Sequence, residues 1–194
     1  MQHRMHGIFI LEKFVANNGT KKFAPMLIGL HWAMLLLLAA VYAAMELRGI
    51  FPKGSDAREA MKTWHYMLGL SVGVLVCIRL VARLVTVTPV IVPLPPKWQQ
   101  WLGQLVHAGL YALMIAMPLL GWALLSAEGE SIPLFGLELP ALVQENDSLA
   151  DQLKEVHEFI GTAGYFLIGL HALAALFHHY LLRDNTLRRM LPFK

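Results

Sequence analysis

Four long apolar stretches are the feature that most constrains the fold of this chain. They run from about Pro25 to Leu47, Trp64 to Val85, Trp101 to Leu125 and Leu153 to Leu182. A helix needs about 20 mostly apolar residues to cross a bilayer, and each stretch is long enough. Only 15% of the 194 residues are charged, whereas soluble domains have about 25%. The sequence therefore predicts an all-α integral membrane protein, a bundle of four transmembrane helices.

The rest of the chain is short, and it excludes several classes of protein. We assign residues 1–24 to an N-terminal extension, 25–182 to the four-helix domain and 183–194 to a tail. A net charge of +3 does not indicate nucleic-acid binding, because the chain offers no soluble basic surface. Cys77 is the only cysteine, which excludes an intrachain disulfide framework, a thiolate iron–sulfur cluster and a c-type haem attachment motif.

The distribution of Lys and Arg predicts the orientation of the helices. Cytoplasmic loops of membrane proteins carry an excess of these residues. If both termini and the loop between the second and third helices share one side, that side holds all but five of the 16 Lys and Arg residues. We therefore expect both termini to be cytoplasmic. The five residues on the outer side are Arg48, Lys53, Arg58, Lys62 and Lys154, and the first four form a basic island on an otherwise acidic face.

Four histidines lie in the predicted helices at two matched depths. His65 and His157 are near the outer side, and His31 and His171 are near the cytoplasmic side. The 14 residues from His157 to His171 return to within about 40° of the same helix face and rise about 21 Å. A histidine inside a membrane span is a functional candidate, although a simple helix–helix hydrogen bond is the alternative. The pattern gives one cross-helix pair in each leaflet.

Paired imidazoles in a helix bundle are typical of axial ligands to a haem b iron. Small residues next to the ligands would leave room for a flat porphyrin, and glycines follow both outer histidines at Gly69, Gly73, Gly161 and Gly164. Such glycines also serve close helix packing. We expect two haem b groups per chain. Structural zinc is disfavoured, because neither His3 with His6 nor His178 with His179 has a nearby cysteine or an i,i+4 histidine partner.

Three further polar residues are candidates for secondary contacts. His107, early in the third helix, could ligate a metal, but that helix has no second histidine to form a pair, so a hydrogen bond to a haem propionate or to another helix is favoured. His178 lies on the same face as His171 and about 10 Å nearer the cytoplasm, so it could contact a quinone or lie among lipid headgroups. Arg79, near the end of the second helix, could bind a propionate or a quinone carbonyl, or extend to lipid phosphates.

Several short motifs occur together in one order along the chain. They are His31-Trp32, residues 44–52 (AMELRGIFP), His65, residues 79–83 (RLVAR), Thr88-Pro89, His157-Glu158, residues 164–171 (GYFLIGLH), residues 178–180 (HHY) and residues 184–190 (DNTLRRM). In this combination the chain resembles the bacterial cytochrome b561 family from about Pro25 to its C-terminus. Residues 1–20 depart from the pattern, since family members commonly start nearer the first histidine.

The resemblance implies an activity and a set of ligands. It implies haem b ligation by His31 with His171 at the inner haem and by His65 with His157 at the outer haem. It also implies a multi-pass protein of the bacterial inner membrane that exchanges electrons with a quinone. We expect an enzyme that oxidises superoxide to dioxygen and passes the electrons to ubiquinone.

The basic island has a role in this hypothesis. Arg48, Lys53, Arg58 and Lys62 would attract superoxide to the outer haem. Two alternatives stay open. One is a quinol-oxidising cytochrome b subunit that exchanges electrons with a redox partner protein. The other is a haem-free four-helix transporter or structural membrane protein.

Overall fold

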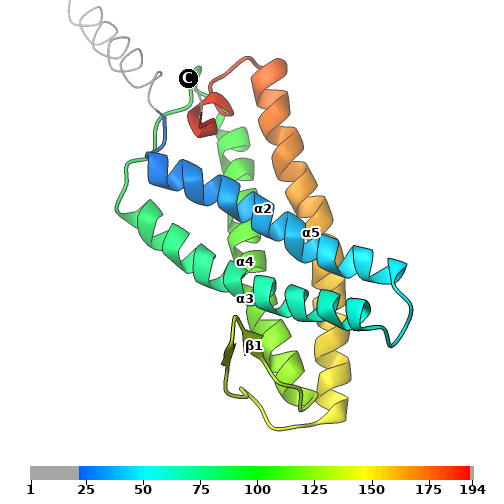
Figure 1. Ribbon diagram of the computed structural model, residues 1–194. Helices are drawn as coiled ribbons and strands as arrows, with labels where there is room; N and C mark the ends of the chain where they lie inside the picture. The colour runs from blue at the N-terminus through cyan, green and yellow to red at the C-terminus, as the bar shows by residue number, and fades with distance from the viewer. Residues whose placement is uncertain (1–21, 193–194) are drawn as a thin grey trace, which may run out of the picture.

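The computed structural model describes residues 22–192, and almost all of them lie in or between four long helices (Figure 1). The predicted extension, residues 1–24, falls almost wholly outside this range. The long helices are α2 (Pro25–Leu47), α3 (Asp56–Leu84), α4 (Lys97–Ala127) and α5 (Asp147–Tyr180). Short 3-10 turns follow α2 and precede the C-terminus, at η1 (Arg48–Ile50) and η2 (Arg188–Met190). The four predicted helices are therefore confirmed.

Helices α3 and α5 begin earlier than hydropathy predicts, because polar residues cap them. The Ser55 hydroxyl accepts a hydrogen bond from the Arg58 backbone N–H at 3.3 Å, and Asp56 and Glu59 occupy the first turn of α3. At α5 the Asn146 side chain accepts from the Leu149 N–H at 3.0 Å. Such caps and acidic first turns satisfy the free N–H groups and the dipole of a helix start. Helix α3 thus gains eight residues before Trp64.

The long helices present their apolar side chains outward. All four have the length and composition needed to cross a membrane, and in none of them is more than 22% of the most apolar window buried inside the protein. In water such a surface would be unstable, whereas lipid covers it without cost. The fold is thus consistent with a four-span membrane bundle.

The helices form two antiparallel hairpins that cross each other. Figure 1 shows α2 beside α3 and α4 beside α5, and the most extensive contact between the hairpins joins α3 to α4. A small core of Met34, Val72, Val76 and Met114 fills the crossing. We name the end of the bundle that carries the start of α2 and the end of α5 the inner end, after its predicted cytoplasmic side. The opposite end is the outer end.

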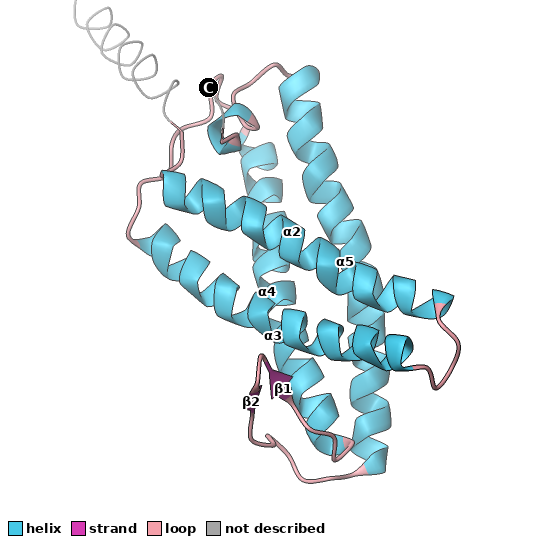
Figure 2. Cartoon of the chain, in the orientation of Figure 1, coloured by secondary structure: helices cyan, strands magenta, loops and turns pink. Residues whose placement is uncertain are grey.

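An ordered loop covers the outer end of α4. A two-stranded hairpin, β1 (Pro133–Leu134) and β2 (Leu137–Glu138), projects from it and β1 packs on α3 (Figure 2). The indole N–H of Trp122 donates to the Pro140 carbonyl at 2.9 Å, and the Leu142 N–H donates to the Ser126 hydroxyl at 3.0 Å. These bonds hold the loop against the helix.

The C-terminal tail ties the inner end together. The indole N–H of Trp32 donates to the Met190 carbonyl at 2.9 Å, so the tail reaches α2. The Val92 N–H donates to the Asn185 side chain at 2.8 Å, and the Arg189 guanidinium donates to the Pro89 carbonyl. The tail therefore contacts both α2 and the proline-rich loop between α3 and α4.

Candidate functional site: two histidine layers

The outer layer joins α3 to α5 through His65 and His157. Their ring centres are 6.2 Å apart and the ring planes meet at 73°. The Nδ1 atom of His65 lies 3.0 Å from the Val41 carbonyl oxygen. Because a carbonyl only accepts hydrogen bonds, Nδ1 carries the proton and Nε2 keeps a free lone pair. This is the tautomer that a metal ligand bonded through Nε2 requires.

His157 is placed against a glycine of α4. A Cβ atom on Gly121 would lie 3.4 Å from Cε1 of His157, so a larger residue would press on the ring. Nδ1 of His157 is buried and has no hydrogen-bond partner in the structure. A buried imidazole without a partner is costly unless its ring gains another interaction, such as a metal bond.

The inner layer joins α2 to α5 through His31 and His171. Their ring centres are also 6.2 Å apart, with an angle of 68° between the ring planes. His107 of α4 lies beside this pair, its ring centre 5.2 Å from that of His171. The structure therefore brings together both predicted pairs and adds His107 to the inner one.

The spacing within both pairs fits a metal bound between two imidazoles. Metal–imidazole bonds are about 2.0–2.1 Å long and a ring nitrogen lies about 1.1 Å from the ring centre, so two imidazoles on opposite sides of one metal have centres about 6.3 Å apart. The observed separation is 6.2 Å in each layer. Within residues 22–192 no three His, Cys, Asp or Glu side chains gather as a metal site. Two protein ligands suit a haem, because the porphyrin supplies the other four nitrogens.

The other candidate residues at the inner end bind different partners. Nη1 of Arg79 donates to the Leu27 carbonyl at 3.4 Å, which holds the guanidinium against α2. Nδ1 of His178 donates to the buried Asp184 carboxylate at 2.6 Å. His178 thus anchors the tail. An apolar groove of about 600 Å³ opens nearby, lined by Phe23, Pro25, Ile28, Gly29 and Trp32 together with Lys22 and Pro192.

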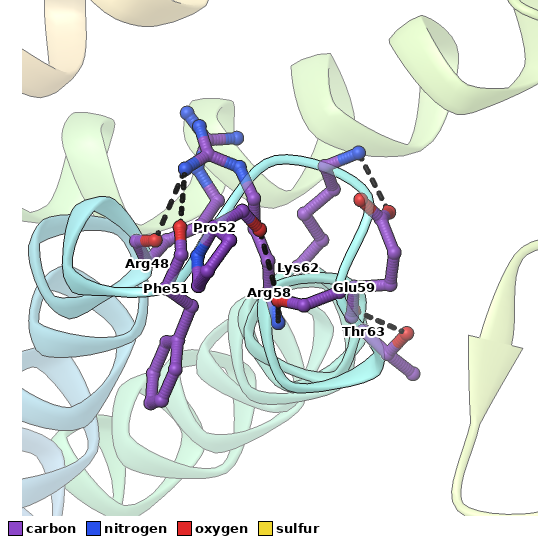
Figure 3. A network of polar contacts seen from close by, with 8 residues as sticks. Arg48, Phe51, Pro52, Arg58, Glu59, Lys62 and Thr63 are labelled. Atoms are coloured by element: carbon purple, nitrogen blue, oxygen red, sulfur yellow. Dashed lines mark hydrogen bonds and ion pairs between the residues drawn. The ribbon is translucent and has the colours of Figure 1, made fainter.

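The four residues of the basic island are not equivalent, and Figure 3 shows three of them, Arg48, Arg58 and Lys62. Arg58 folds back and donates through Nη1 to the Phe51 carbonyl at 3.0 Å and the Arg48 carbonyl at 3.3 Å. Lys62 forms an ion pair with Glu59 at 2.7 Å. Across the part of the chain that the structure describes, the side chains of Arg48 and Lys53 form no ion pair. Arg58 and Lys62 are therefore partly engaged in holding the loop, and Arg48 and Lys53 retain their charge for solvent.

Comparison with known proteins identifies the family. The family model described as prokaryotic cytochrome b561 matches residues 22–193, which is most of the chain. The chain belongs to the prokaryotic cytochrome b561 family. It is 46% identical over 171 residues to "Cytochrome b561 homolog 1" of Escherichia coli, covering 88% of this chain and 97% of that protein. It is 43% identical over 174 residues to "Probable superoxide oxidase CybB" of Yersinia pestis, covering 90% and 98% of the two chains.

A more distant relative has the same extent. "Cytochrome b561 homolog 2" of Escherichia coli is 25% identical over 182 residues, which cover 90% of this chain and 93% of that protein. Membership in the cytochrome b561 family makes this chain a bacterial membrane electron-transfer protein and an oxidoreductase, and it implies b-type haem.

In this cytochrome b561 member the glycines allow close packing of the helices as much as they leave space beside the candidate histidine ligands. A Cβ on Gly73 would lie 3.2 Å from Pro118, and one on Gly164 would lie 2.3 Å from the Tyr42 hydroxyl. The glycine that faces a candidate ligand is Gly121, which sequence reasoning missed. Its signal was its position, 14 residues after His107 on the same helix.

Proposed function

We propose that this cytochrome b561 member is a superoxide:ubiquinone oxidoreductase of the bacterial inner membrane that holds two haem b groups per chain, with both termini in the cytoplasm. The observation that supports it most is the pair of histidine layers, each with ring centres 6.2 Å apart. The name of the Yersinia pestis relative, a probable superoxide oxidase, supports the choice of reductant.

In this proposal four histidines would hold the haems. His65 and His157 would hold the outer haem, and His31 and His171 would hold the inner haem. When bound, the haems would supply redox-active iron that accepts and donates single electrons. The protein supplies orientation: the Val41 carbonyl fixes the tautomer of His65, and Gly121 gives His157 its place. With two histidines committed to each haem, outer-sphere electron transfer would be favoured over oxygen binding.

Superoxide would reach the outer layer beside η1. Arg48 and Lys53 carry positive charge there without an ion pair among the described residues, while Arg58 and Lys62 support the loop. A basic surface raises the local concentration of a small anion and its association rate. Each superoxide ion loses one electron and leaves as dioxygen. Two superoxide ions, one ubiquinone and two protons then yield two dioxygen molecules and one ubiquinol.

Ubiquinone would bind at the inner end. The groove beside Trp32 has a volume of about 600 Å³, inside the range of about 300–1,000 Å³ common for small-molecule sites. Arg79 and His178 do not line this groove, and they are the candidate hydrogen-bond donors to a quinone carbonyl elsewhere at the inner end. Since Nδ1 of His178 is engaged with Asp184, its Nε2 atom is the one that could contact the quinone. His107 is the candidate for a hydrogen bond to a propionate of the inner haem.

Haem content tests the ligand assignment. A reduced-minus-oxidised spectrum and a pyridine haemochrome assay of the purified protein should give two b-type haems per chain. His157→Ala should remove one haem and His171→Ala the other, while His179→Ala keeps both. Loss of neither haem in folded His157→Ala and His171→Ala protein would refute the assignment. Absence of a Soret band in the parent protein would favour the haem-free transporter.

Superoxide-driven haem reduction tests the basic island. Replacing both Arg48 and Lys53 with Gln should slow the reaction by about threefold or more at low ionic strength and flatten its salt dependence. Lys154→Gln, on the outer side but away from this loop, is the matched control. An unchanged rate in the double variant would contradict superoxide steering. Haem reduction by ubiquinol but not by superoxide would favour the quinol-oxidising alternative.

A further inference from the structure

A 14-residue register runs through three of the four helices. On α5 it separates His157 from His171, on α3 it separates His65 from Arg79, and on α4 it separates Gly121 from His107. Fourteen residues turn a helix to within about 40° of its starting face and advance it about 21 Å. On α5, ring contacts place His157 in the outer layer and His171 in the inner layer. On α4, Gly121 lies against His157 in the outer layer, and His107 lies beside His171 in the inner layer. Arg79 is therefore the inner-layer counterpart of His65.

The two layers differ in the residues that are not candidate ligands. In the outer layer α4 contributes Gly121 and α2 contributes the Val41 carbonyl, and neither carries a charge. In the inner layer α4 contributes His107 and α3 contributes Arg79. Among residues 22–192, only the inner layer thus has a permanent cation in register with its histidine pair.

Arg79 is fixed close to one of these histidines. Its guanidinium donates to the carbonyl of Leu27, which lies four residues, or one helical turn, before His31. The side chain is half-buried. Within residues 22–192 no carboxylate forms an ion pair with it. The charge is therefore not neutralised by a contact from the described chain.

A fixed cation changes the redox equilibrium of a nearby haem. Oxidation from the ferrous to the ferric state adds one positive charge, which a neighbouring cation opposes, and the low dielectric of a membrane bundle strengthens the effect. We propose that Arg79 is a potential-setting residue, whose charge makes the inner haem easier to reduce than the outer one. This inference rests on the proposed function, because it requires two bound haems.

The consequence is a direction for electron transfer. One electron moves from the outer site to the inner site, so the outer site is oxidised and the inner site is reduced, with no bond made or broken and no proton transferred. Electrons that enter at the outer end then accumulate next to the candidate quinone site. Arg79 is not a ligand of the iron in this proposal. Its positive charge acts on the reduction potential of the inner haem.

Spectroelectrochemical titration of the holoprotein measures this effect directly. Arg79→Gln should lower the midpoint potential of the inner haem and shift the inner–outer electron equilibrium at least tenfold, which is 59 mV for a one-electron couple. Arg79→Lys keeps the charge and should retain most of the difference. Arg83→Gln, which removes an exposed cation four residues away on α3, is the matched control and should have a smaller effect. The His157→Ala protein, which should keep only the inner haem, identifies the inner component.

The outcomes separate this inference from the proposed function. Two haems in Arg79→Gln with a parental difference in potential, or an equal shift of both potentials, would overturn the role of Arg79 and leave the function intact. Absence of haem from the parent protein would refute the proposed function itself. If Arg79→Gln loses the inner haem, Arg79→Lys decides the question. A tenfold shift of the inner–outer electron equilibrium in this variant, which retains the positive charge, would also overturn the inference.

Discussion

At the scale of single residues, Gly164 sets how closely α5 approaches its neighbours. The Tyr42 hydroxyl donates to the Gly161 carbonyl at 2.9 Å, and its ring lies 4.3 Å from that of Tyr165. The Tyr165 hydroxyl in turn donates to the Glu46 carboxylate at 2.7 Å. This chain of contacts between α2 and α5 forms only because position 164 has no side chain, since a Cβ there would lie 2.3 Å from the Tyr42 hydroxyl.

Gly164→Ala should therefore destabilise the bundle. Overpacking of a close contact costs about 1–3 kcal/mol, here with displacement of Tyr42 from its hydrogen bond. Gly169→Ala is the matched control, because a Cβ at that position has no neighbour within 4 Å and Ala favours a helix by about 1 kcal/mol over Gly. Thermal unfolding in one detergent should rank Gly164→Ala below the parent and Gly169→Ala at or above it. The reverse order would contradict this packing.

At the scale of elements, one side chain joins η1 to α3. Arg58 lies in the first turn of α3 and donates to the carbonyls of Arg48 and Phe51, just beyond the end of α2. Ser55 caps the same turn from the other side. The loop that carries the basic island therefore has a defined shape because one of its cations is used as a structural donor.

Arg58→Gln should loosen this connection, whereas Lys53→Gln should not. Loss of the two charge-assisted bonds of a half-buried side chain should cost about 1 kcal/mol of local stability. Lys53 is exposed, and such substitutions usually change stability by about 0.5 kcal/mol or less. Amide hydrogen exchange over residues 48–55 should accelerate in Arg58→Gln alone. Equal protection in the two variants would mean that Arg58 does not hold the turn.

At the scale of the whole molecule, the tail connects chain segments far apart in sequence. Arg189 is buried, lies 5.4 Å from the centre of the Phe23 ring and donates to the Pro89 carbonyl. Burial lowers the pKa of its guanidinium, and the Asp184 carboxylate acts in the opposite direction. Asp184 also accepts from the Thr186 N–H at 2.8 Å. The tail thus closes the inner end across α2, α5 and the α3–α4 loop.

Arg189→Gln should release the tail. Loss of a buried cation from its ring and carbonyl contacts should raise the population of the open tail roughly tenfold. Limited proteolysis, with detection of a C-terminal tag, should cleave Arg189→Gln faster than the parent protein. Arg188→Gln is the matched control, because Arg188 is exposed. Similar cleavage of the two variants would show that Arg189 does not fasten the tail.

The sequence alone determined the features that depend on local pattern. Apolar length fixed the number of helices, because a bilayer sets the length of a span. Helical periodicity and depth predicted the pairing of His65 with His157 and of His31 with His171. The family was also predictable, since its motifs are short and lie in order along the chain.

Only the tertiary structure decided which side chains come into contact when helical periodicity does not relate their positions in the sequence. The pairing of His178 with Asp184 depends on how the chain turns after α5, and the use of Arg58 as a donor depends on the path of η1. The place of Gly121 beside His157 depends on the angle at which the two hairpins cross. Periodicity gives the face of one helix, but contacts between helices depend on their rotation and crossing angle, which packing sets. For the same reason, only the folded chain placed Arg79 against the carbonyl of Leu27, one helical turn before His31.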